Sequence, residues 1–150
     1  IAVIAVLAGA LLLAINPQAI IQKGRDAKRL QDLDALQKAV NLALADSEVL
    51  LTANDATCAT CSSASGTRVV DGTGYVKFTV VDGKTGLSKF LATLPADPLN
   101  ADANVYTFGS TTADFELNAV LEHADTASKM STDGGDAAGV YEVGTSLTIL

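Results

Sequence analysis

The chain has 150 residues, and its 10 basic and 17 acidic side chains leave a net charge of −7. This length suits one small domain, and the negative charge disfavours nucleic acid as a primary partner because it repels phosphate. Hydrophobic residues make up 49% of the chain, and many of them belong to one uncharged segment at its start.

The first predicted element is an apolar N-terminal helix at residues 1–24. Residues 1–15 carry no polar side chain, and Asn16-Pro17-Gln18 is followed by the apolar residues 19–21. A helix needs about 20 apolar residues to span a membrane, so the segment reaches that length only when residues 19–21 are included. Pro17 removes a backbone donor inside it. We expect this helix to lie in a membrane or among other apolar helices.

The second predicted element is an amphipathic helix at residues 25–55. Apolar residues recur there every three or four positions and form one face; they include Leu30, Leu33, Leu36 and Val40. The charged residues from Arg25 to Lys38 are expected mostly off this face, and Asn54-Asp55 is expected to end the helix. A helix that is apolar in its first part and amphipathic in its second has to meet two environments along one axis.

A loop of small residues at 56–66 contains the two cysteines of the chain, Cys58 and Cys61. Their spacing fits a haem attachment site, a redox pair, half of a zinc site or a disulfide. Ser62 stands where covalent haem needs histidine, and no second cysteine pair supplies the remaining zinc ligands. A disulfide is therefore favoured over free thiols, on a loop expected at the outer surface. The nearby hydroxyls are candidate O-glycosylation sites: Ser62, Ser63, Ser65 and Thr67.

Residues 56–150 are predicted to form a small β-sheet head. Alternating apolar residues and glycine turn signals indicate four strands and one short helix. The strands are expected at 75–81, 105–108, 114–121 and 140–143, and the helix at 87–94. One long helix followed by a small antiparallel sheet is an α+β fold.

Three aspartates on predicted loops, Asp97, Asp133 and Asp136, offer the oxygen ligands that calcium prefers. Asp133-Gly134-Gly135-Asp136 is also ordinary turn chemistry, and a solvated turn is favoured over a calcium site. His123 is the only histidine, and no nucleophile or metal-ligating cluster lies beside it in the sequence. We find no enzyme signature and expect no catalytic residue, and calcium is the only cofactor candidate.

Several segments, in order along the chain, resemble bacterial type IV pilins and type II secretion pseudopilins. Residues 1–17 resemble the N-terminal helix of these proteins, and residues 25–33, beginning Arg25-Asp26-Ala27-Lys28-Arg29, resemble its continuation. Leu94-Pro95-Ala96-Asp97-Pro98 is similar to a segment before a paired strand, and residues 133–144 are similar to the family's ending. The cleavage-site glycine, the methylated first residue and the fifth-position glutamate of the family are absent, so we expect a short segment to precede Ile1.

The resemblance implies a pilin fold and a structural role. The chain is expected to be a major pilin subunit that polymerises into an extracellular type IV pilus-like filament for adhesion, motility or surface attachment. Before assembly it would occupy the inner membrane, where the pilus assembly machinery would add it to the filament. Its main partner is then a further copy of itself, and the filament-core contacts would come from Ile4, Leu7, Gly9, Leu11, Leu12, Ile15 and Pro17.

A basic cluster follows the apolar segment and consists of Lys23, Arg25, Lys28 and Arg29. In a filament, these side chains are expected to contact acidic residues of adjacent subunits. The alternative is a solvated helix face within one chain.

Two other functions remain open on the sequence. A type II secretion pseudopilin would share the fold, and calcium bound near the C-terminus would favour it. The Ser/Thr-rich loop and the cysteine pair favour a surface-exposed pilin instead. A monomeric membrane-anchored binding module is the alternative from another class, with the apolar helix as a lone anchor. Electron microscopy of the purified protein distinguishes an assembling subunit from a monomer.

Overall fold

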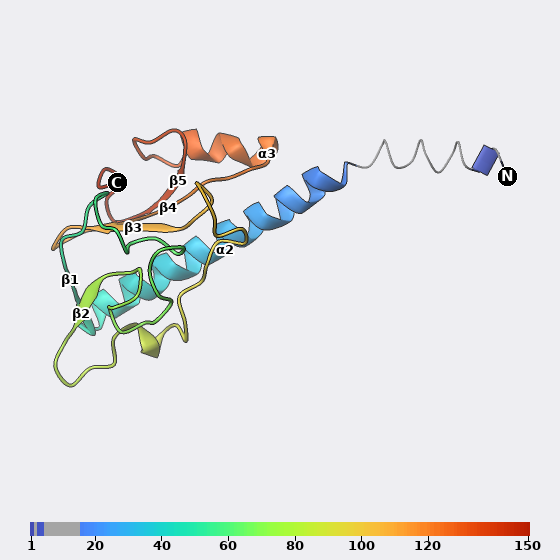
Figure 1. The fold of residues 1–150 in the computed structure, drawn as a ribbon. Coiled ribbons are helices and arrows are strands. Elements are labelled where there is room, and N and C mark those ends of the chain that lie inside the picture. Colours follow the sequence, from blue (N-terminus) through green and yellow to red (C-terminus); the bar gives the residue numbers. More distant parts are fainter. Residues whose placement is uncertain (2, 5–15) are drawn as a thin grey trace.

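The fold consists of one long helix and a small antiparallel head, as the computed structural model shows for residues 1, 3–4 and 16–150 (Figure 1). The elements follow in this order: helix α2 (Pro17–Ala45), strands β1 (Val49–Leu51) and β2 (Phe78–Val80), 3-10 helix η1 (Gly86–Lys89), strands β3 (Thr107–Ser110) and β4 (Phe115–Ala119), helix α3 (Ala124–Ala127), 3-10 helix η2 (Ser128–Ser131) and strand β5 (Tyr141–Gly144). The predicted α+β class is confirmed.

Helix α2 begins at residues that suit a helix N-terminus. Pro17 occupies the first turn, where its missing donor costs nothing, and the Asn16 side chain accepts a hydrogen bond from the Ala19 N–H (3.3 Å). The Asn16 backbone is extended, with φ −81° and ψ 97°. A single helix therefore does not continue through Asn16, contrary to the prediction. Within the described residues, no helix has both the length and the apolar character needed to cross a membrane.

Helix α2 ends at Ala45, so the predicted helix end at Asn54-Asp55 is wrong. Ser47 has a positive φ of 53°, a conformation that cannot continue a right-handed helix. Residues 49–51 instead form β1, which pairs antiparallel with β2. The local helical periodicity is overridden because the strand pairing satisfies the backbone and buries Val49 and Leu51.

The buried face of α2 carries the predicted apolar stripe and extends it with charged residues. The apolar members are each at most 1% exposed: Leu33, Leu36, Val40 and Ala43. Toward the N-terminus, Arg29 and Asp26 continue the same three- and four-residue spacing, and both are 0% exposed. The prediction that charged residues lie off this face is therefore wrong for these two. It is also wrong for Asp32, which is 6% exposed and accepts a hydrogen bond from the Tyr106 hydroxyl (2.9 Å).

Two sheets complete the head. Strand β1 pairs with β2, while β3, β4 and β5 form a three-stranded antiparallel sheet with β4 in its centre. Across this sheet Phe108 lies opposite Leu117, and Leu117 lies opposite Val143, in the core shared with α2. Alternate residues point to opposite faces of a strand, so Glu116 and Asn118 lie on the other face of β4, called here the outer face of the sheet.

Strands β3, β4 and β5 confirm three of the four predicted strands, whereas two other elements are shorter than expected. Only Phe78–Val80 of the predicted strand 75–81 forms β2. Tyr75 is buried in irregular structure, where its hydroxyl donates to the Pro95 carbonyl (2.9 Å). The predicted helix at 87–94 is reduced to the single 3-10 turn η1.

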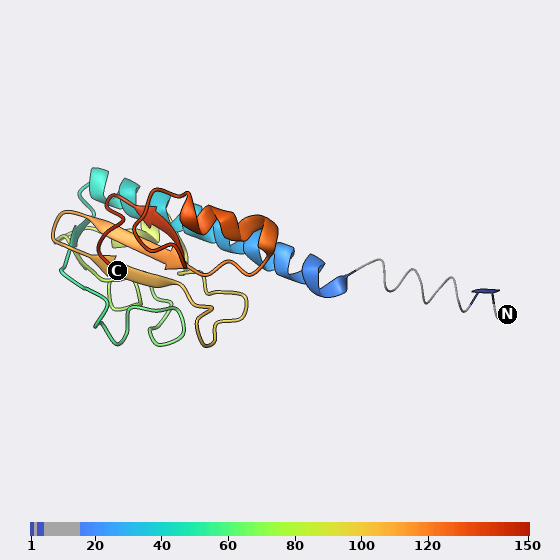
Figure 2. The same cartoon turned by 90° about the horizontal axis from the view of Figure 1, so that it is seen from above.

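The head covers the C-terminal part of α2 and leaves the first turns of this helix projecting (Figures 1 and 2). On these turns, Ile20 and Ile21 are 61% and 51% exposed. Lys23, slightly further along, pairs with Asp125 at the head (2.6 Å). The described start of α2 therefore presents apolar side chains away from the head.

Candidate functional site

A buried group of charges joins α2 to two later segments of the chain. We call it the Arg29 cluster, and it consists of Arg25, Asp26, Arg29, Asp97 and Glu122. The Arg29 guanidinium donates two hydrogen bonds to Asp97, from Nε to Oδ2 (2.6 Å) and from Nη2 to Oδ1 (2.9 Å). Its Nη1 donates to Asp26 Oδ1 (2.9 Å) and to Glu122 Oε2 (2.5 Å). One buried cation thus holds carboxylates from α2, from the loop before β3 and from the segment after β4.

Asp26 fixes the segment after β4 through its backbone. Its carboxylate accepts the N–H groups of Glu122 (2.9 Å) and His123 (2.8 Å), together with the Thr126 hydroxyl. Arg25 donates two further hydrogen bonds to the Glu122 carboxylate (2.6 and 2.8 Å). Charge-assisted and bidentate contacts are the strong class of hydrogen bond, so the cluster determines how the head sits on α2.

Four members of the cluster, Arg25, Asp26, Arg29 and Glu122, have pKa values shifted so that they stay charged at neutral pH. Burial alone would lower the pKa of Arg29, but hydrogen bonds to its three carboxylate partners raise it above its ordinary value. The hydrogen bond from Arg25 holds the pKa of Glu122 below 4.5, against the effect of burial. Burial would raise the pKa of Asp26, but hydrogen bonds from a hydroxyl and two backbone N–H groups keep it below 3.8.

We expect acid to destabilise the head through this cluster. The folded-state pKa values of Asp26 and Glu122 are lowered, so their stabilisation is present above the ordinary values of 3.8 and 4.5 and is lost as the pH falls through the folded-state values. Thermal unfolding followed from neutral to strongly acidic pH measures this loss. Glu122→Gln should lower stability at neutral pH and flatten the acid dependence, and an unaltered acid profile in this variant would contradict the assignment.

The predicted contacts between subunits are only partly compatible with this arrangement. Arg29 is enclosed in its own chain, so the prediction is wrong for this residue. The Arg25 side chain is 18% exposed and uses its donors on Glu122. The Lys23 and Lys28 side chains are 53% and 55% exposed, and each pairs with an acidic residue of its own chain. These two lysines stay candidates for contact with another copy.

The predicted filament-core residues lie mostly outside the described residues. This holds for Leu7, Gly9, Leu11, Leu12 and Ile15. Ile4 is described and is 72% exposed, and Pro17 is exposed in the first turn of α2. The packing of all seven residues in a filament stays a prediction.

Cys58 and Cys61 form a disulfide, with their Cα atoms 5.4 Å apart. Cys61 is 2% exposed, and its carbonyl accepts the Phe108 N–H (2.8 Å), whereas Cys58 is half-buried. The backbone of Ser62 forms an isolated bridge with Thr107. The loop is therefore attached along β3.

The four hydroxyl candidates on and after this loop differ in exposure. Ser63 is 4% exposed; its Oγ donates to Asn100 Oδ1 (2.6 Å) and accepts the Tyr106 N–H (2.9 Å). The prediction that Ser63 is a glycosylation site is therefore wrong, because its hydroxyl is buried and forms two hydrogen bonds. Ser65 and Thr67 are exposed and Ser62 is half-buried, so these three stay candidates.

Replacing both cysteines with serine is expected to cause only a modest loss of stability. A disulfide that closes a 15-residue loop contributes about 3 kcal/mol, and a shorter loop contributes less. The loop also keeps its backbone bonds to β3. Denaturant unfolding of the double variant measures the loss, and mass spectrometry of the unreduced protein tests the bond itself. Two readily alkylated thiols in the native protein would contradict it.

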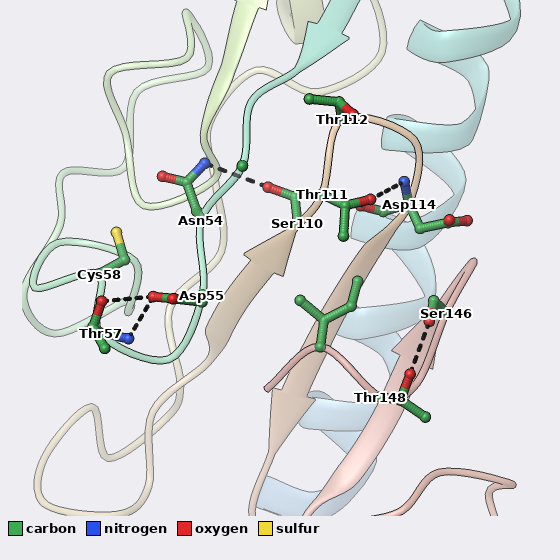
Figure 3. A pocket seen from close by; sticks show the side chains of 12 residues that line it. Asn54, Asp55, Thr57, Cys58, Ser110, Thr111, Thr112, Asp114, Ser146 and Thr148 are labelled. Carbon is green, nitrogen blue, oxygen red and sulfur yellow. Dashed lines mark hydrogen bonds between the residues drawn. The ribbon is translucent and has the colours of Figure 1, made fainter.

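A polar cleft of about 780 Å³ lies at the end of the head away from the start of α2 (Figure 3). Residues 53–58 after β1, residues 110–114 between β3 and β4, and residues 146–149 line it. The first two segments are joined because Asn54 and Ser110 exchange two backbone hydrogen bonds, each 2.7 Å long. The cleft thus brings together three segments that are distant in the sequence.

Nine of the twelve residues that line this cleft carry a hydroxyl, amide or carboxylate group, and its two charged members are Asp55 and Asp114. Asp55 Oδ1 accepts the Thr57 N–H (2.9 Å) and the Thr57 hydroxyl (2.6 Å), which fixes the carboxylate. No basic side chain belongs to the lining. The cleft therefore disfavours anions and suits neutral or cationic groups that form hydrogen bonds.

The calcium candidates serve other contacts. Both side-chain oxygens of Asp97 accept hydrogen bonds from Arg29, so the calcium prediction is wrong for this residue. Asp133 accepts the N–H groups of Gly135 (3.1 Å) and Glu142 (2.9 Å) and so supports the turn, while Asp136 is exposed. Among the residues that the structure describes, no group of three or more histidine, cysteine or acidic side chains could hold a metal ion.

His123 has a structural position at the start of α3. Its Nδ1 accepts the Asp125 N–H (3.1 Å), which caps this short helix. The residue is half-buried, and its backbone N–H donates to Asp26 (2.8 Å).

Sequence reasoning missed the Arg29 cluster, although one signal was present. Asp26 and Arg29 precede Leu33 and Leu36 with the spacing of the buried stripe. Charged residues at such positions point to a buried pair. The partners Asp97 and Glu122, 68 and 93 residues from Arg29, could not be identified from local pattern.

Comparison of the chain with protein-family models, with curated proteins and with solved structures found no match. The functional interpretation therefore depends on the residues and the geometry described above.

Proposed function

We propose that the chain is a pilin-like structural subunit that polymerises into an extracellular type IV pilus-like filament, with no catalytic role. The observation that carries this proposal is the projecting start of α2, with Ile20 and Ile21 exposed, directly after the uncharged residues 1–15. Exposed apolar surface of this kind marks an interaction site. Packing against the same segment of other copies would gain about 25 cal/mol for each Å² of apolar surface removed from water.

The apolar N-terminal segment would lie in two environments in succession, first a membrane and then a filament core. Before assembly, the apolar residues 1–15 would anchor the subunit in the inner membrane. The assembly machinery would then transfer the subunit to a filament whose core is built from these segments. The resemblance of residues 1–17 and 25–33 to pilins supports this order.

The Arg29 cluster supports the mechanical part of the proposal. A filament transmits load from the core helices to the heads, so the head has to stay fixed on its helix. In this chain, buried ion pairs at Arg29 link α2 to two segments of the head. The attachment therefore does not depend on apolar packing alone.

The far end of the head supports a role in surface attachment. With the start of α2 in the filament core, the disulfide loop and the polar cleft would lie away from the core. The cleft's hydroxyl and carboxylate groups would then be available to external molecules.

The decisive experiment is assembly of the full chain. The protein is purified in a mild detergent, the detergent is removed, and the sample is examined by electron microscopy and light scattering. Filaments of uniform diameter are expected. A matched variant that lacks residues 1–21 should stay a soluble monomer. Full-chain protein that enters lipid vesicles as monomers and never forms filaments would support a membrane-anchored binding module instead.

A further inference from the structure

The segment after β5 folds back over the outer face of the sheet, held by a buried carboxylate. Glu116 Oε2 accepts the N–H groups of Ile149 (2.7 Å) and Leu150 (3.2 Å). Glu116 is 0% exposed. The Thr145 N–H donates to the Phe115 carbonyl (3.0 Å), which fixes the start of the same segment on β4.

A second buried carboxylate lies beside it on β5. Glu142 is 1% exposed and lies opposite Asn118 in the β4–β5 register, next to Glu116 on the same face. Its Oε2 accepts the Ala137 N–H (3.1 Å) and so holds the loop 133–139. Gly135 packs so closely on this carboxylate that an added Cβ would lie 2.0 Å from Oε2.

Three buried oxygens at this place have no hydrogen-bond donor within the described part of the chain: Glu116 Oε1, Asn118 Oδ1 and Glu142 Oε1. An unsatisfied buried acceptor costs about 1–3 kcal/mol, and more when the group is charged. Among the described residues, no basic side chain forms an ion pair with either glutamate. Two buried carboxylates side by side without a cation cannot both be ionised at low cost.

We propose that Glu116 and Glu142 share one proton and that this proton latches the C-terminal segment 145–150 and the loop 133–139 onto the sheet. A protonated Glu142 donates its O–H to Glu116 Oε1. One proton then gives a hydrogen-bond partner to two of the three unpaired oxygens, Glu142 Oε1 and Glu116 Oε1. Glu116 Oε2 continues to accept the two N–H groups of the C-terminal segment. This inference does not depend on filament assembly.

The surrounding charges favour the shared proton. Burial raises the pKa of Glu142 above 4.5, and the neighbouring Glu116 and Asp133 raise it further, whereas the Ala137 N–H opposes them. Asp133 faces the pair from the loop after η2. Lys129 of η2 shares a small cleft with Glu142 and Asp133 but forms no ion pair with either glutamate. Gln37, which faces β5 from α2, is neutral and donates to the Gly144 carbonyl (3.2 Å).

The sign of the pH effect follows from the raised pKa. A carboxyl group whose pKa is raised by folding stabilises the fold at low pH, and this stabilisation is lost as the pH rises through the folded-state value. The latch should therefore loosen toward alkaline pH, opposite to the Arg29 cluster. Ser146, Thr148 and Ile149 of the latched segment line the polar cleft, so opening the latch removes one wall of that cleft.

The test combines two measurements on the full chain in detergent solution. Carbon NMR of labelled glutamate follows each carboxyl group; the chain has four glutamates, Glu48, Glu116, Glu122 and Glu142. Glu142 is expected to titrate above 4.5. Hydrogen exchange of the Ile149 and Leu150 amides, corrected for intrinsic rates, should show protection that falls by up to about tenfold for each pH unit between 4.5 and the titration of Glu142 and that levels off above this titration.

Glu142→Gln separates the shared proton from simple burial. The amide can donate to Glu116 without titrating, so protection of Ile149 and Leu150 should become independent of pH. Asp136→Asn removes a negative charge from the same loop without touching the pair and should leave the wild-type profile unchanged. A Glu142 that titrates at or below its ordinary value in the native protein would overturn the proposal. An equal pH dependence of protection in Glu142→Gln would overturn it too.

Discussion

Replacing Arg29 with methionine is expected to lower the free energy of unfolding by about 3–5 kcal/mol, the cost of removing one partner from a buried ion pair. Methionine fills much of the same volume, so the loss comes from the carboxylates that remain. Asp26 and Asp97 are both buried and would lose the cation that compensates their charge. Denaturant unfolding of the full chain at neutral pH measures the change.

Two further variants make this result specific. Lys38→Met removes an exposed pair with Asp34, whose side chains are 69% and 57% exposed, and should change stability by less than about 1 kcal/mol. Arg29→Lys keeps the charge but cannot form the two-pronged contact with Asp97, so its loss should be intermediate. A stability loss in Arg29→Met no larger than that in Lys38→Met would refute the structural role of the cluster.

Much of the helix and the sheet could be predicted because their signals are local. The three- and four-residue spacing of Leu33 and Leu36 predicts the buried face of α2, and alternation predicts β3, β4 and β5. The predicted end of the helix was wrong because the structure of residues 49–51 depends on a segment distant in the sequence. Val49 and Leu51 continue an apolar pattern that fits helix or strand, and the choice is made by β2, which follows only after the disulfide loop.

The Arg29 cluster shows the same limit for a site. The sequence predicts a loop around Asp97, and aspartates on loops offer the oxygen ligands that calcium prefers. The fold instead brings a guanidinium from α2 onto both of those oxygens. The burial of Ser63 could not be predicted for a related reason. It belongs to a polar loop, and its burial follows from contacts with Asn100 and Tyr106, which only the folded chain brings together.

Replacing Ile20 with aspartate is expected to prevent filament assembly while leaving the head folded. Ile20 is 61% exposed on the projecting turns of α2, so the isolated subunit loses almost nothing by the change. In a filament the same side chain would be buried, a contribution of about 1.5–3 kcal/mol for isoleucine. Burying a carboxylate there would add a desolvation cost. The critical concentration for assembly should therefore rise by at least about tenfold, since about 1.4 kcal/mol corresponds to a factor of ten.

Leu50→Asp provides the matched control, because Leu50 is also 61% exposed but lies on β1, at the other end of the head (Figure 1). Both variants add one negative charge at an exposed apolar side chain. Only the position relative to the start of α2 differs. Sedimentation after detergent removal, with electron microscopy of the pellet, gives the critical concentration for each. If Ile20→Asp assembled as readily as Leu50→Asp, the start of α2 could not be part of the filament core, because a buried carboxylate at Ile20 would have to weaken every subunit contact along the fibre.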